Sequence, residues 1–283
     1  MRIASKSYLD LLQQGIRRAE GDLGKLTQQI SSGRRITRPS DDPIGTSQAL
    51  RAHATLDTVN SQKSALQRAS HINNAADEAL GQLTRPLQTA SDAALRATQV
   101  GVGEAGREAC AQEVRAAMSR VVTIGNSEFA GIYLFGGTDN TAPPLSETGG
   151  PGAPVAYDGN ETAMNIEVAP DRSVDLTITA QKLFNFDNAA GNRPVGSIDS
   201  DLFTVMENLA SSIESGDVEA INEYRGQLDS LRDHTVAERG RLGATGVRLE
   251  QSISMSKDAE LQCKTILAEV EEADEGRVEI EDV

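Results

Sequence analysis

The stretch SSGRRITRPSDDPIG, Ser31–Gly45, separates two long segments that both show helical periodicity. Gly33 suits the position just after a helix, where the backbone turns left-handed. Pro39 and Pro43 each disfavour helix in the residue before them. Asp42 is placed to cap a new helix that has Pro43 as its first residue. The stretch therefore predicts a helix end, a short extended link and a new helix start.

This stop and restart motif comprises Gly33, Arg34, Arg35, Arg38, Pro39, Ser40, Asp41, Asp42 and Pro43. Asp41 and Asp42 place negative charge where the dipole of the following helix favours it. No further carboxylates are close in sequence, so we expect no metal site here.

Residues 1–31 carry a narrow apolar stripe typical of a coiled coil. We call it the amino-terminal seam; its residues are Ile16, Ala19, Leu23, Leu26 and Ile30. About 30 residues at a rise of about 1.5 Å give a rod of about 45 Å. One narrow stripe is not stable alone in water, and Gly15, Gly21 and Gly24 weaken the helix further. We predict that this segment is disordered until another helix pairs with it.

Helical periodicity returns from Ile44 to about Val100, with Pro86 predicting a kink or a break. The run GVGEAG at 101–106 matches G-x-G-x-x-G, but no strand precedes it, so it predicts a helix–turn–helix corner instead of a nucleotide site. A third helix is predicted over 108–128. Towards one side of it lie Val114, Met118, Val121 and Val122.

The period changes to that of strands at Phe129. FAGIYLFGGTDN, residues 129–140, predicts a hairpin whose core is Tyr133, Leu134 and Phe135. Residues 139–160 are rich in Pro and Gly and predict loops, while 155–169 and 173–186 show strand-like alternation. Helices are predicted again over 199–216 and 217–273. The expected fold is mainly α, an elongated bundle of long antiparallel helices with a small β-rich insertion.

Composition narrows the class of function. The net charge is −15, which argues against nucleic-acid binding and against docking on anionic membranes. No window is apolar enough for a membrane span, and the start of the chain has no cleavable signal pattern. Cys110 and Cys263 are expected to be separate buried thiols, with a bridge left open. The three histidines lie in helical runs, and no catalytic motif is present, so we expect no catalytic, cofactor or metal residues.

Three motifs together resemble the flagellar hook-associated protein 3 family, a relative of flagellin. They are SSGRRITRPSDDPIG at 31–45, GIYLFGGTDNTAPPL at 131–145 and VAYDGN at 155–160. The resemblance implies a flagellin-like bundle with a coiled-coil segment at 1–32. Residues 33–138 and 198–283 would form the helical rod with its hairpin, and 139–197 the outer insertion.

The resemblance also implies a secreted structural subunit of the bacterial flagellum. Its partners would be hook-associated protein 1, flagellin, other copies in a ring, the flagellar export apparatus and an export chaperone, with no nucleic acid and no membrane. Arg34, Arg35 and Arg38 would bridge acidic groups of neighbouring subunits or remain solvated charges, and both readings stay open. A short flagellin and a helical chaperone-like module are the alternatives.

One departure from the family pattern concerns the end of the chain. Family members continue for several helical turns past an acidic stretch such as VEEAD, whereas here VEIEDV follows. A shortened chain or a divergent member would explain this. In either case we expect residues 1–31 to fray and self-assembly of the isolated chain to be weak.

Overall fold

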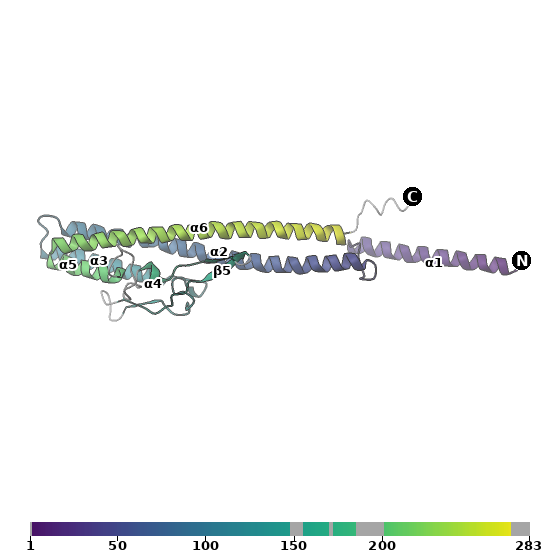
Figure 1. The fold of residues 1–283 in the computed structure, drawn as a ribbon, viewed down its shortest axis with the longest axis horizontal. Helices are drawn as coiled ribbons and strands as arrows, with labels where there is room; N and C mark the ends of the chain where they lie inside the picture. Colours follow the sequence, from purple (N-terminus) through teal and green to yellow (C-terminus); the bar gives the residue numbers. More distant parts are fainter. Residues whose placement is uncertain (1, 148–154, 170–171, 185–200, 273–283) are drawn as a thin grey trace. The chain divides into compact units, whose positions relative to one another are not determined.

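The computed structural model describes residues 2–147, 155–169, 172–184 and 201–272. The helices are α1 (Arg2–Ser32), α2 (Pro43–Ala97), α3 (Glu104–Gly125), α4 (Ala180–Leu183), α5 (Leu202–Ser215) and α6 (Val218–Glu271). The strands are β1 (Glu128–Phe129), β2 (Ile132–Tyr133), β3 (Leu145–Glu147), β4 (Val155–Tyr157), β5 (Asn165–Ala169) and β6 (Arg172–Asp175). Long helices with small strand pairs confirm the predicted fold class (Figure 1).

The chain divides into two compact units. One unit consists of residues 1–64 and 254–283, and the other of residues 65–253. Both α2 and α6 contribute to each unit, and in each unit early residues of one helix face late residues of the other. The two helices therefore pair antiparallel within each unit. The domain boundaries expected from the sequence stay predictions.

Most helix ends lie where the turn residues placed them. α2 begins at Pro43, and Gly101 adopts a φ of 95° in the turn between α2 and α3. The predicted corner at 101–106 is therefore only partly correct, because residues 104–106 already form the first turn of α3. Pro86 does not break α2, which continues through it to Ala97. The third helix begins at Glu104 instead of 108, because Gly103 stands in an extended conformation directly before it.

The β-rich part consists of three two-stranded antiparallel pairs. β1 and β2 form the predicted hairpin, with Phe129 opposite Ile132. Its two turn residues, Ala130 and Gly131, have φ values of 53° and 83°, the left-handed conformation that tight hairpins require. β3 pairs with β4, and β5 pairs with β6.

The strand expected over 173–186 is only partly correct, because α4 occupies its second half. Thr179 caps α4 by accepting a hydrogen bond from the Lys182 amide. Residues 148–154, 170–171 and 185–197 of the expected insertion lie outside the described residues.

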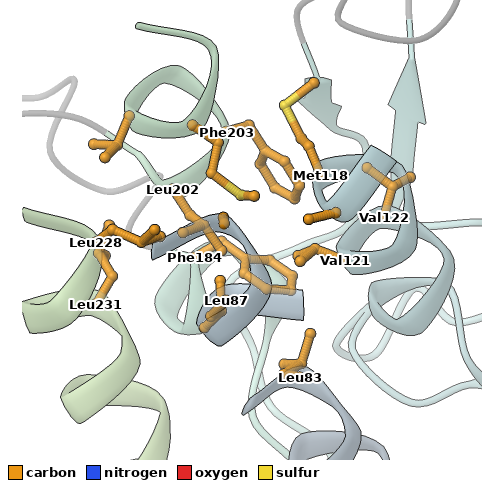
Figure 2. Packing of buried hydrophobic residues seen from close by; sticks show 14 of the residues in the cluster. Leu83, Leu87, Met118, Val121, Val122, Phe184, Leu202, Phe203, Leu228 and Leu231 are labelled. Atoms are coloured by element: carbon orange, nitrogen blue, oxygen red, sulfur yellow. The ribbon is translucent and has the colours of Figure 1, made fainter. Parts of the chain in front are cut away.

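The main core lies in the unit formed by residues 65–253, where α2, α3, α5 and α6 meet (Figure 2). Phe184, directly after α4, is fully buried and its ring lies 5.2 Å from that of Phe203 on α5. Alanines supply much of the α2 contact surface, and such small side chains let helices approach closely. These alanines are Ala76, Ala79, Ala90, Ala93, Ala94 and Ala97.

A smaller cluster attaches the β5–β6 pair to the helices. The cluster consists of Leu66 on α2, Leu176 directly after β6, and Leu249 on α6, all of them buried. The side-chain amide of Asn73, also buried, donates to the Leu176 carbonyl over 3.1 Å. This bond satisfies a backbone acceptor that would otherwise be buried without a partner.

Candidate assembly site

The amino-terminal seam lies on α1 and is largely exposed. Ile16 is 59% exposed, Leu23 67% and Ile30 63%, while Ala19 is exposed and Leu26 half-buried. Large apolar side chains at this spacing normally face another helix. Among the described residues of this chain, none buries the seam. Whether α1 is ordered in the free chain stays a prediction.

The connector after α1 begins as predicted. Gly33 has a φ of 66°, and its amide donates to the Ile30 carbonyl over 3.4 Å. A Cβ at this position would meet no other atom, so the backbone conformation alone favours glycine here.

Arg35 is the centre of the connector. Its amide donates to the Glu271 carbonyl over 2.6 Å. Its guanidinium donates to the Val270 carbonyl through Nε at 3.2 Å and Nη2 at 2.8 Å. Val270 and Glu271 are the last residues of α6, whose terminal carbonyls lack partners inside the helix. A cation also suits the negative end of the helix dipole, so Arg35 caps α6.

The same guanidinium reaches the start of α2. Its Nη2 lies 3.2 Å from Oδ2 of Asp42, while Oδ1 of Asp42 accepts the Gly45 amide at 2.8 Å. The Gly45 hydrogen bond, assisted by Arg35, holds the pKa of the Asp42 carboxyl below its usual range. The predicted Asp42 cap is thereby confirmed in its geometry, and Arg35 joins it to the end of α6.

The other motif residues lie on the surface of the connector. Asp41 accepts the Arg38 amide at 2.9 Å and the Thr37 hydroxyl at 3.2 Å, which closes a small turn. Pro39 and Ser40 are exposed in that turn. The carboxylate of Asp41 is thus used for local structure.

Side chains of α2 and α6 hold this unit together beyond the connector. Ala49, Ala52 and Leu267 form a small buried cluster. His53 lies 2.9 Å from a Glu271 carboxylate oxygen. Glu260 accepts hydrogen bonds from Lys264, at 2.7 Å, and from Lys63. These two bonds lower the pKa of Glu260 to about 2.

The hairpin core predicted from the sequence is packed in the other unit. Leu134 is 2% exposed and Phe135 is fully buried, whereas Tyr133 is half-buried. The carbonyl of Phe135 accepts the Ala180 amide at 2.8 Å, so the hairpin also positions α4.

Two of the quoted motifs contact each other directly. The Asn160 side chain accepts the Thr138 amide at 3.0 Å and donates to the Thr138 hydroxyl at 2.6 Å. The Tyr157 hydroxyl donates to the Asn160 carbonyl at 2.6 Å. Gly137 has a φ of 75°, and a Cβ there would lie 2.2 Å from Oδ1 of Asn160. The Phe-Gly-Gly-Thr and Tyr-Asp-Gly-Asn runs therefore form one interlocked turn.

Within the described part of the chain no group of three or more His, Cys, Asp or Glu side chains could hold a metal ion. His234 is used for structure, since its ring nitrogen lies 3.1 Å from the Lys182 carbonyl. Cys110 and Cys263 are both buried and free. The described helices include none with the length and apolar character to cross a membrane.

Sequence reasoning missed two contacts. The first is the hydrogen bonding of Arg35 to the end of α6, and the second is the contact between residues 135–138 and residues 157–160. Both join residues distant in sequence, and the first spans 235 positions. The signal for the second was the pair Gly136–Gly137, because adjacent glycines in a strand-like run indicate a close backbone approach.

Comparisons with known proteins agree with this geometry. The profile of the bacterial flagellin N-terminal helical region matches residues 7–140. Flagellar hook-associated protein 3 of Salmonella typhimurium is 27% identical, over 97% of this chain and 89% of the relative. The protein of the same name from Escherichia coli is 24% identical, over 92% of this chain and 85% of the relative.

Solved structures share the fold. A flagellar hook-associated protein from Vibrio parahaemolyticus matches with a TM-score of 0.71 at 15% identity, covering 82% of this chain and 100% of that one. FlgL of Xanthomonas campestris matches with a TM-score of 0.62 at 16% identity, covering 77% and 99%. Together these comparisons show that the chain is similar to flagellar hook-associated protein 3 over most of its length and shares the fold of these solved structures, while residues 7–140 match the flagellin N-terminal helical region.

Proposed function

We propose that the chain is a structural subunit of the bacterial flagellum that joins the hook to the filament. The observation that carries this proposal is the exposed amino-terminal seam on α1. A regular apolar stripe left open in the free chain is the pattern of a subunit that completes its helical interface in an assembly. The full-length relatives, both hook-associated proteins, support the same role.

The energetics of the seam fit assembly. Fully burying a Leu or Ile side chain contributes about 1.5–3 kcal/mol. Ile16, Leu23 and Ile30 are each about 60% exposed, so a pairing helix would gain roughly 1–2 kcal/mol from each of them. That gain is available only when another helix pairs with α1, so the exposed seam favours association with neighbouring copies.

The partners follow from the same proposal. The chain would contact hook-associated protein 1 on one side, flagellin on the other, and further copies of itself in a ring. It would reach that position outside the cell through the flagellar export apparatus, with an export chaperone as a further partner. The alternative of a filament-forming flagellin is less favoured, because both full-length relatives are hook-associated protein 3.

A deletion strain tests the role. Loss of a junction subunit should release flagellin into the medium unattached, whereas loss of the flagellin itself should leave a bare, capped hook. A tagged wild-type chain should restore filaments and be located at the distal end of the hook. Label distributed along the filament would instead support the flagellin alternative, and a strain that keeps normal filaments would contradict both.

The seam has a matched control on the same helix. Leu23 lies on the seam and is 67% exposed, while Gln14 is exposed on the opposite side of α1, nine positions and thus about two and a half turns away. Leu23→Asp should abolish incorporation at the hook tip, and Gln14→Asp, which introduces the same charge, should retain it. Equal incorporation of both variants would show that the seam does not carry assembly.

A further inference from the structure

A hollow on the connector contains cationic and apolar groups that the described residues of this chain leave without complementary partners. It measures 280 Å³ and lies where residues 34–39 cross α2. Its lining includes Arg34, Ile36, Arg38, Pro39, Leu50 and His53. All of these residues belong to the unit of residues 1–64 and 254–283.

Charge is the first observation. The chain has 42 acidic residues against 27 Lys and Arg. Several of its arginines pair with carboxylates, such as Arg115 with Glu207 and Arg239 with Asp77. Within the described ranges, however, the guanidinium groups of Arg34 and Arg38 have no ion-pair partner. The acid in the lining, Glu271, faces His53 at 2.9 Å.

The apolar floor is the second observation. Leu50 is 70% exposed, although it lies on α2 between the buried Ala49 and Ala52. A large aliphatic side chain beside two unpaired cations is the composition of an interface hot spot with a charged rim. The hollow thus fits a surface that is acidic and presents an apolar group between its carboxylates.

We propose that this hollow receives an acidic surface of a second copy of the chain. Leu50 forms the apolar centre of the contact, and Arg34 and Arg38 are its charge partners. Charge complementarity selects the occupant, because a subunit with a net charge of −15 is itself the acidic partner that the hollow needs. This inference rests on the proposed function, in which copies of the chain lie side by side.

The test places a photo-crosslinking amino acid, p-benzoylphenylalanine, at position 50 of the full chain. The chain is expressed in the deletion strain, and its flagella are irradiated. We expect a cross-linked dimer whose partner peptide comes from an acidic surface of another copy. A product with a different protein, a product within one molecule that includes residues 273–283, or no product from an incorporated chain would overturn the proposal.

Charge reversal provides the quantitative arm. Arg34→Glu with Arg38→Glu should lower the dimer yield about tenfold, since two attractive pairs become repulsive. The double variant Arg68→Glu with Arg120→Glu changes the net charge by the same amount, at exposed arginines outside the hollow. This control should lower the dimer yield less than about twofold. Equal yields in the two double variants would refute the charge pairing.

The wild-type chain separates this proposal from the proposed function. If the wild type does not incorporate at the hook tip, the proposed function fails. If it incorporates and position 50 gives no dimer, only the hollow proposal fails.

Discussion

Replacing Arg35 by Ala removes the cap of α6 without touching the connector's backbone bond. The guanidinium gives the Val270 carbonyl two hydrogen bonds, at 3.2 and 2.8 Å. Charged hydrogen bonds contribute about 1.5–3 kcal/mol, and a cation at a helix end about 0.3–1 kcal/mol. The Arg35 side chain is 45% exposed, so solvent screening places the loss near about 1–2 kcal/mol. Local opening of the connector should then become about 5–30 times more frequent.

Hydrogen–deuterium exchange with mass spectrometry measures this directly. In the Arg35→Ala variant, the peptide covering residues 33–46 should exchange about 5–30 times faster, and the end of α6 should exchange faster with it. Arg34→Ala is the matched control, because the Arg34 side chain has no bond to the described part of the chain. If Arg34→Ala accelerates exchange as much as Arg35→Ala, the capping argument is wrong.

Three further predictions concern the free chain. Trypsin should cleave α1 at sites such as Lys25 before it attacks the rest, because no described residue covers the seam; resistance of the amino end in a dilute monomer would contradict this. Gly137→Ala should lower the free energy of unfolding by more than about 2 kcal/mol, since the new Cβ adds a backbone clash to left-handed strain. Gly101→Ala, at a φ of 95° with open space around it, should lower it by about 1–2 kcal/mol. Equal losses of the two variants in denaturant unfolding would refute the close approach of Gly137 to Asn160. Glu260 has a folded pKa of about 2 against an ordinary 4.5, so its contribution to the free energy of unfolding is complete above about pH 4.5 and is lost as pH falls towards 2. Glu260→Gln should therefore make the free energy of unfolding fall less steeply between pH 4.5 and pH 2. An unchanged pH dependence in this range would argue against the Lys63 and Lys264 bonds.

Local chemistry made the start of the fold predictable from sequence. Gly33 and Pro43 each determine backbone conformation within one or two residues, and Asp42 caps the helix three residues before Gly45. The period change at Phe129 likewise located the hairpin. Each of these signals acts over a few positions, where steric rules and hydrogen bonds are decided by neighbouring residues.

Long-range and context-dependent features were not predictable in the same way. Pro86 removes one helical hydrogen bond, but packing of α2 on both sides of it keeps the helix continuous. Three arginines in the connector look alike in sequence, yet among the described residues only the Arg35 side chain of the three is hydrogen-bonded to the end of α6. The difference between Arg35 and its neighbours depends on where residue 270 arrives in space, which no local pattern encodes.

The bond between Arg35 and Val270 orders the events of folding in time. A ribosome adds about 5–20 residues per second, so residue 270 follows residue 35 by about 10–50 s. Until then α6 has no terminal carbonyls for the guanidinium to hold, and closing so long a loop afterwards carries its own entropic penalty. A polypeptide that ends before residue 270 therefore cannot form the hydrogen bond between Arg35 and Val270. The bond forms only after nearly all of α6 has been synthesised.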